Sequence, residues 1–233
     1  DGDSLDHISI ETLPSNGTLL LSGNAVSAGD QISVANISNL VFRPVANANG
    51  DDYDTFTFSV NDGTVDSGTY TMTIDVTAVN DAPLATDDAD AVNENATITE
   101  SSGSELLVAD DTDTDGNTLT VTQIAITGGS NSSVTSSTTY SNGTSITGTY
   151  GTLTVGANGS YTYVADQSAS DDLDASDLAT DSFTYTISDG TTTDTATLII
   201  TVTGINDVPT ASDKTISTAE DNPYVFSTSD FGF

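Results

Sequence analysis

Hydrophobic and polar residues alternate with a period of two along much of this chain, which is the pattern of β-strands that bury one face. The alternation is clearest at 56–60, 70–76 and 183–187. No segment keeps a 3.6-residue period, so the sequence predicts an all-β fold with almost no helix.

Short turns rich in Gly, Asn, Asp and Pro separate the expected strands. A single helical turn fits within the acidic stretch 166–181. The remaining strands are expected at 5–12, 17–21, 31–34, 39–43, 106–108, 118–127, 144–150, 152–155, 161–164 and 195–203.

The chain contains an internal repeat. TFTFSVNDG at 55–63 matches SFTYTISDG at 182–190, and VTAVNDAP at 76–83 matches VTGINDVP at 202–209. The period from Asn80 to Asn206 is 126 residues. That length suits one β-sandwich per repeat.

The phase of the repeat predicts one whole sandwich and two partial ones. Residues 80–207 form the complete domain, residues 1–79 lack the opening two strands, and residues 208–233 supply the first strands of a further sandwich. A sandwich that lacks two strands exposes edges and an apolar face. The tail of one chain is therefore expected to complete the head of another by donor-strand pairing, although an arbitrary cut through a longer tandem polypeptide explains the same phase.

Charge restricts the possible partners. The 233 residues include 35 acidic and two basic ones, Arg43 and Lys214, for a formal net charge of −33. Coulomb repulsion then opposes binding to nucleic acid or to an anionic membrane, and no apolar run is long enough for membrane insertion. Cysteine is absent, so disulfides do not stabilise the fold.

The densest acidic stretch is DDTDTDGN at 110–117, with four carboxylates and an amide in eight residues. Hard oxygen ligands without His or Cys suit Ca²⁺ better than a transition metal. The loop begins like an EF-hand, but the twelfth position is Thr122 rather than Glu. The sequence therefore favours a calcium site at a joint between β-domains, and the alternative is a merely solvated acidic turn.

The Asn-Asp-x-Pro joints, the Glu94-Asn95 pair and the Asp-x-Asp-x-Asp-Gly-Asn loop together resemble the cadherin-like tandem repeats of large bacterial surface proteins. These include the VCBS repeats of RTX-type adhesins and biofilm proteins. The resemblance implies tandem immunoglobulin- or cadherin-like Greek-key β-sandwiches with Ca²⁺ at the interdomain joints.

The resemblance also implies which residues bind the ions. At the leading end of the complete domain the implied ligands are Asn80, Asp81, Asp111, Asp113, Asp115 and Asp189. At the trailing end they are Glu94 with Asp174, Asp177 or Asp181, facing Asn206 and Asp207. The first partial domain adds Asp51, Asp52 or Asp54, with Glu220 of another chain, and also Asp1, Asp3 and Asp62. Other acidic residues, such as Asp66 and Asp194, are expected on the solvated surface.

No enzymatic activity is expected. Ser and Thr are abundant but lack an activating partner, and His7, the only histidine, is expected at the surface. The paired carboxylates repeat with the domains, which fits joints better than a single glycosidase cleft.

The expected function is a structural repeat of an extracellular bacterial stalk, adhesin or filament, at the cell surface or in a biofilm matrix. Its expected partners are copies of itself or adjacent repeats, head to tail. The alternative is a carbohydrate-binding or homophilic adhesion module, for which the loop 128–145 with Tyr140 is the candidate face.

Overall fold

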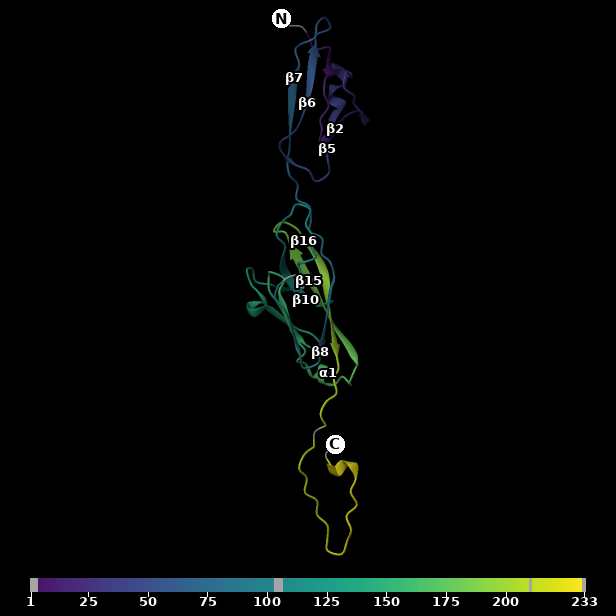
Figure 1. Ribbon diagram of the computed structural model, residues 1–233, viewed down its shortest axis with the longest axis vertical. Helices are drawn as coiled ribbons and strands as arrows, with labels where there is room; N and C mark the ends of the chain where they lie inside the picture. Colours follow the sequence, from purple (N-terminus) through teal and green to yellow (C-terminus); the bar gives the residue numbers. More distant parts are fainter. Residues whose placement is uncertain (1–3, 103–106, 210, 232–233) are drawn as a thin grey trace. The chain divides into compact units, whose positions relative to one another are not determined.

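The computed structural model describes residues 4–102, 107–209 and 211–231. The chain divides into two compact units, Asp1–Asp81 and Ala82–Phe233, each with a hydrophobic core of its own (Figure 1). Both units are built from β-strands, which confirms the prediction of an all-β fold. In the described ranges no helix has the length and apolar character needed to span a bilayer.

The first unit contains two sheets. One sheet has the strand order β4-β1-β6-β7 and the other has the order β3-β2-β5. A 3-10 helix, Val34–Asn39, precedes β5. The strands are β1 (His7–Ile10), β2 (Gly17–Leu21), β3 (Asn24–Ala25), β4 (Gln31–Ser33), β5 (Leu40–Pro44), β6 (Gly50–Asn61) and β7 (Tyr70–Val76).

Alternating residues of these strands form the core of the first unit. Ile10, Ile32 and Phe56 come from one sheet and Leu19 comes from the other, and all four are buried. Because the two sheets bury their apolar faces against each other, the unit is a two-layered sandwich.

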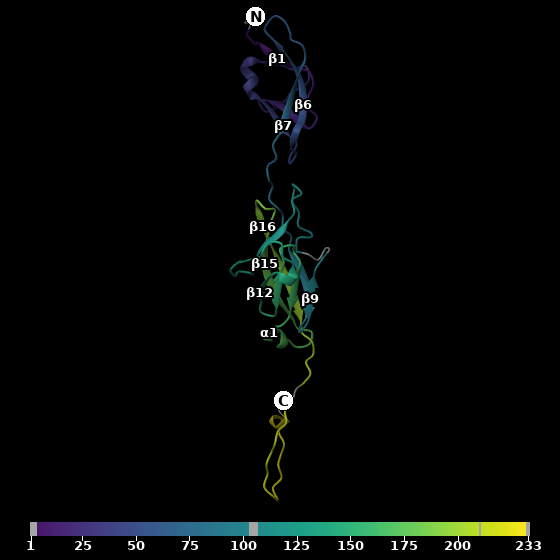
Figure 2. The same cartoon turned by 90° about the vertical axis from the view of Figure 1, so that its left-hand side faces the viewer.

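The second unit contains a sheet with the order β11-β10-β15-β16-β8 and another with the order β12-β13-β14-β9 (Figures 1 and 2). The α-helix α1 (Ser168–Asp171) is the helical turn expected in the acidic stretch. The strands are β8 (Asp88–Asn93), β9 (Thr97–Glu100), β10 (Thr120–Ile126), β11 (Ser132–Ser133), β12 (Thr144–Thr147), β13 (Thr152–Val155), β14 (Tyr161–Val164), β15 (Leu178–Ser188) and β16 (Thr193–Thr203).

The opening strands of the second unit join its two sheets at one side. β8 pairs in parallel with β16, whereas β9 pairs antiparallel with β14. The turn between β8 and β9 places Asn95 at φ 58°, a left-handed conformation that Asn tolerates better than most residues. One short segment therefore closes both sheets over a core that includes Tyr163, Phe183 and Leu198.

Three local expectations differ from the structure. Residues 88–93 form a strand that the alternation of apolar residues did not reveal. Leu107 and Val108, expected in a strand at 106–108, lie in a turn, and Leu107 is fully buried there; residue 106 is outside the described residues. The opening strands expected in the tail are not formed at 211–227, where no ladder partner is present among the described residues.

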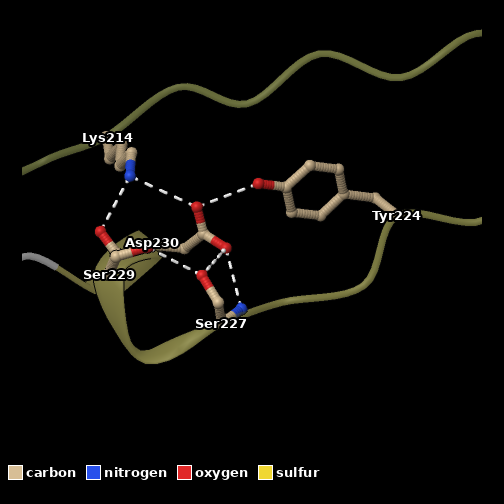
Figure 3. Close-up of polar contacts among 5 residues, drawn as sticks. All are labelled: Lys214, Tyr224, Ser227, Ser229 and Asp230. Carbon is tan, nitrogen blue, oxygen red and sulfur yellow. Dashed lines mark hydrogen bonds and ion pairs between the residues drawn. The ribbon is translucent and has the colours of Figure 1, made fainter.

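The tail makes polar contacts of its own around Asp230 (Figure 3). Lys214 Nζ lies 3.2 Å from Asp230 Oδ1, and the Tyr224 hydroxyl donates a hydrogen bond of 2.9 Å to the same oxygen. Asp230 belongs to a 3-10 helix, Thr228–Phe231. These side-chain contacts hold the segments on either side of the turn at Glu220 together.

Candidate metal centre

The first group of candidate ligands surrounds Asp111 in the second unit. A β-bridge between Leu84 and Thr112 places this acidic loop beside the segment that leads into β8. The Thr86 N–H donates a hydrogen bond of 2.8 Å to Asp111 Oδ1. Asp111 Oδ2 is buried and has no hydrogen-bond partner among the described residues. The loop therefore presents one unsatisfied carboxylate oxygen.

Asp88 and Asp111 lie in an environment that disfavours their negative charge. Burial raises the pKa of Asp88 to about 6, and the nearby charges of Asp110, Asp111 and Asp87 act in the same direction. Burial likewise raises the pKa of Asp111 to about 6, with Asp110 and Asp194 contributing. A cation would relieve both the desolvation and the mutual repulsion of these groups.

Asp113 has the same arrangement as Asp111. Its Oδ1 accepts hydrogen bonds from the N–H groups of Asp115 and Asn117 at 2.9 and 3.0 Å, whereas its Oδ2 is buried and has no partner in the described ranges. These two backbone bonds shape the loop. They leave the second oxygen of Asp113 for a ligand.

The structure adds residues that the sequence did not single out. Asp194 Oδ2 accepts the Ala85 N–H at 2.9 Å, and Asp87 Oδ1 accepts the Thr197 N–H at 2.8 Å. Asp194, expected on the solvated surface, is thus close enough to Asp111 to influence its charge. Neither Asp87 nor Asp194 lies in a motif. The pairing of β8 with β16 brings both residues near the candidate ligands.

The second group of candidate ligands surrounds Glu94, which is only 1% exposed. Glu94 Oε1 accepts the Ile205 N–H at 2.7 Å, and Glu94 Oε2 is buried without a hydrogen-bond partner among the residues described. An unpaired buried carboxylate oxygen is costly. A cation next to Asn206 and Asp207 would satisfy it.

The loop that carries Asp174 and Asp177 packs at the same end of the sandwich. The Gly204 N–H donates to the Asp177 carbonyl and the Ser176 N–H donates to the Gly204 carbonyl, both at 2.9 Å. The backbone of the loop that carries Asp174 and Asp177 therefore lies next to the segment that Glu94 binds.

Asp181, the third candidate ligand predicted beside Asp174 and Asp177, has a different environment from those two residues. It is 4% exposed, and it accepts hydrogen bonds from the N–H groups of Thr149, Tyr150 and Gly151 at 2.7 to 3.1 Å and from the Tyr163 hydroxyl at 2.7 Å. Both oxygens of this carboxylate are occupied by donors of the protein itself. Its evident role is to fix the turn that leads into β13.

Asp54 is the counterpart of Asp181 in the first unit. Its oxygens accept the N–H groups of Ser15, Asn16 and Thr55 at 2.7 to 3.0 Å. Burial raises the pKa of Asp54, but these backbone hydrogen bonds outweigh it, so the pKa lies below its ordinary value. Asp51 and Asp52, the other candidates nearby, are exposed.

Asp62 and Asp189 occupy equivalent turns in the two units. Asp62 Oδ1 accepts the N–H groups of Thr64 and Val65, and Asp189 Oδ1 accepts those of Thr191 and Thr192. Such side-chain caps stabilise the turns between strands.

The two joints share one local geometry. Asn80 Nδ2 donates to the Asp81 carbonyl at 2.7 Å, and Asn206 Nδ2 donates to the Asp207 carbonyl at 2.9 Å. Glu220 is exposed in the tail. Asp1 and Asp3 lie outside the described residues.

The donor set fits a hard cation, but its carboxylates are not gathered around one point. No group of three or more His, Cys, Asp or Glu side chains in residues 4–102, 107–209 and 211–231 is close enough to hold a metal. Glu94, Asp111 and Asp113 each present one free, buried oxygen. Ca²⁺ takes carbonyl and water oxygens as well as carboxylates, so Glu94 at one end of the sandwich, and Asp111 with Asp113 at the other, would each hold an ion only together with backbone, amide or water ligands.

The fold and these acidic ends define a β-sandwich module of the cadherin-like type. The family model of the bacterial cadherin-like domain matches residues 80–204. That match covers more than half of the chain, and the chain belongs to the bacterial cadherin-like domain family.

No curated protein matches the chain. Among solved structures, an endo-fucoidan hydrolase of glycoside hydrolase family 107 (MfFcnA4) is 20% identical, with 87% of this chain and 24% of that chain covered and a TM-score of 0.30. Domains 4 and 5 of the S-layer protein SbsC are 14% identical, with 84% and 97% covered and a TM-score of 0.23. The chain spans about a quarter of the length of the fucoidan hydrolase.

Proposed function

We propose that this chain is a structural repeat module of an extracellular bacterial stalk, adhesin or filament. In this proposal Ca²⁺ binds at both ends of the second unit and stiffens the chain on either side of the sandwich. Bacterial cadherin-like domains are typically extracellular surface modules. The high negative charge suits such a setting, where divalent cations are plentiful.

The observation that carries the proposal is the carboxylate of Glu94. A buried Glu with one satisfied and one unsatisfied oxygen retains a desolvation cost that the protein itself does not offset. The same feature recurs at Asp111 and Asp113 near the other end of β8. Unpartnered oxygens at both ends of one strand support two ion sites, one toward each neighbouring repeat.

The affinity expected for such sites decides where they act. Extracellular modules bind Ca²⁺ with Kd of about 10⁻⁴–10⁻³ M. At a free concentration 100 times Kd, one site adds about 2.7 kcal/mol to the folded state. The chain segments at both ends of the second unit would be flexible in a low-calcium cytoplasm and rigid outside the cell.

The proposal is tested by calorimetric titration of the full chain with CaCl₂. Glu94→Gln is the test variant. Glu94→Gln keeps the size of the side chain but removes its charge, and we expect it to abolish one class of site. The matched control is Asp172→Asn, an exposed carboxylate of the same unit, which we expect to bind like the parent. Absence of calcium binding by the parent at millimolar concentration would refute the proposal.

A further inference from the structure

Four Asn-Gly pairs occur in the chain, at 16–17, 49–50, 142–143 and 158–159. An Asn followed by Gly is chemically labile, because the nitrogen of the glycine can attack the carbonyl carbon of the asparagine side chain. Glycine favours this attack since it has no side chain to crowd its nitrogen and leaves the backbone free to turn. All four asparagines are exposed, so exposure alone does not separate them. The local packing of each pair does.

The reaction needs room around the glycine. Ring closure rotates the peptide unit that joins the two residues, and the Cα of the glycine moves with it. Gly50 has that room, since an added Cβ would have no atom within 4 Å. Gly50 also lies at the first position of β6, before the irregularity in register that separates it from Asp54. A movement of Gly50 therefore disturbs little regular pairing.

The glycines of the other three pairs are closely packed. An added Cβ at Gly17 would collide with the ring of Phe42, and one at Gly143 would collide with the carbonyl of Val155. Gly159 is itself buried. Rotation of these peptide units is opposed by the surrounding atoms, because a close-packed region has few voids into which atoms can move.

Asn49 and Asn158 are matched in sequence, because both stand in Ala-Asn-Gly. Their local structures differ. Asn158 Oδ1 accepts the Ser160 hydroxyl at 2.6 Å, which fixes the side chain. The Gly159 N–H, the group that would have to attack, donates to the Gly156 carbonyl at 3.0 Å. The side chain of Asn49, in contrast, forms no hydrogen bond with any residue that the structure describes.

Asn16 and Asn142 are matched in the same way, since both stand in Ser-Asn-Gly. Asn142 Oδ1 accepts the Thr139 N–H at 2.9 Å. The backbone of Asn16 is held on both sides, because its N–H donates to Asp54 Oδ2 at 2.7 Å and its carbonyl accepts a hydrogen bond from the Tyr53 hydroxyl. These contacts must be broken or distorted before a ring can close, which raises the barrier to the reaction.

We propose that Asn49 is a site of spontaneous covalent modification. The nitrogen of Gly50 loses its proton and bonds to Cγ of Asn49, and the side-chain nitrogen takes up a proton and leaves as ammonia. The product is a five-membered succinimide ring. Water, the second reactant, then opens the ring at either carbonyl. One opening gives an aspartate at position 49, and the other gives an isoaspartate, in which the main chain runs through the side-chain carbons.

Both products place a new negative charge beside Asp51 and Asp52. These two residues are exposed, and the Asp52 N–H donates to Asp75 Oδ1 at 2.8 Å, so the turn before β6 is already acidic. The isoaspartate also lengthens the main chain by one carbon at the start of β6. The modification is therefore a slow, irreversible change of charge and chain length in the first unit. It does not depend on the calcium proposal, since the reaction uses no metal.

The neighbouring carboxylates determine how the rate responds to salt. Loss of the Gly50 proton creates a negative charge on its nitrogen, and the charges of Asp51 and Asp52 disfavour it. Added salt screens this repulsion, since the Debye length falls from about 30 Å at 0.01 M to about 10 Å at 0.1 M. Modification of Asn49 should therefore become faster with rising ionic strength and with rising pH.

Peptide mapping of the full chain by mass spectrometry tests the proposal. The folded protein is incubated at mildly alkaline pH in heavy-oxygen water, so that modification formed during the experiment carries the isotope. We expect Asn49 to react at least about tenfold faster than Asn158, which corresponds to about 1.4 kcal/mol in activation free energy. Asn16 and Asn142 should also react more slowly than Asn49. Equal rates at Asn49 and Asn158 overturn the proposal.

The same chain unfolded in concentrated urea supplies the control. Packing and internal hydrogen bonds are lost there, so Asn49 and Asn158 should react at similar rates. A difference in urea as large as that in the folded chain would assign the selectivity to sequence instead of structure and would overturn the proposal. So would a folded chain in which Asn49 stays intact while the unfolded chain reacts.

Two variants identify the product and the site. Asn49→Asp is the reference for the aspartate product in ion-exchange chromatography. Asn49→Gln keeps Gly50 and the amide, but its longer side chain would have to close a six-membered ring, which is slower. This variant should therefore lose the fast release of ammonia that the parent shows. Release that persists at the rate of the parent would place the reaction at another residue and contradict the proposal.

Discussion

Asp181 accepts a hydrogen bond of 2.7 Å from the hydroxyl of Tyr163, and the two side chains are 4% and 0% exposed. The same carboxylate accepts three backbone N–H groups from the turn before β13. It therefore connects β15 to the facing sheet through the core. This polar network is thus located inside the sandwich.

Asp181→Asn should destabilise the second unit by at least about 2 kcal/mol, since each hydrogen bond to a buried charge contributes about 1.5–3 kcal/mol. The amide replaces one acceptor by a donor that faces further donors. Urea denaturation followed by tyrosine fluorescence measures the change. Asp172→Asn serves as the exposed control and should change the unfolding free energy by less than about 0.5 kcal/mol.

Asp54→Asn should produce the corresponding effect in the first unit. Its carboxylate has three backbone donors, and its pKa is lower in the folded chain than in the unfolded one. The stability it provides is therefore full above its ordinary pKa and is lost as the pH falls through the folded value. Hydrogen exchange should show faster opening in residues 4–81 alone, and unchanged exchange in that range would contradict the assignment.

The stability of the calcium-free chain should fall as the pH rises. Asp88 and Asp111 have pKa values raised to about 6 from 3.8, so the folded chain binds their protons more tightly than the unfolded chain does. Their contribution is full below pH about 4 and is lost as the pH passes through about 6. Urea unfolding in metal-free buffer at pH 5 and pH 7 should show this loss.

A double variant, Asp88→Asn with Asp111→Asn, separates this local effect from the repulsion of the whole charged chain. The difference in unfolding free energy between pH 5 and pH 7 should shrink in the variant. An undiminished difference would assign the pH dependence to the net charge of −33 instead.

Gly151→Ala should destabilise the second unit by about 1–3 kcal/mol through overpacking. The added methyl group would meet the ring of Tyr163 and the backbone carbonyl of Val164. Gly68→Ala is the matched control, because nothing lies within 4 Å of its added Cβ. Thermal denaturation followed by circular dichroism compares the two, and equal melting temperatures would show that the turn before β13 adapts freely.

The sequence predicted the strands whose inward residues are apolar, and it failed where they are not. β6, β7 and β15 show a clean alternation of Phe, Tyr, Ile and Val with polar residues. The inward positions of β8 include Asp88 and Asp90, which are satisfied by Tyr185 and Tyr161 from strands far along the chain. A polar residue at an inward position is recognisable only once its partner is known.

The candidate site was predictable as far as it depends on local motifs. The acidic loop stood out from its charge and Glu94 was implied by the resemblance to cadherin-like repeats, and the structure gives Asp111, Asp113 and Glu94 buried oxygens without a hydrogen-bond partner among the described residues. Asp194 did not stand out because its proximity to Asp111 results from strand pairing. The network around Asp181 likewise requires the turn at 149–151 to fold against β15.

The parallel pairing of β8 with β16 determines how the second unit responds to tension. Six residue pairs, from Leu198 with Asp88 to Thr203 with Asn93, join the first strand of the unit to its last. Pulling the two ends apart slides these strands along each other, so the hydrogen bonds between them are loaded together in shear rather than opened one after another. A force sensor attached to both ends should record one abrupt rupture.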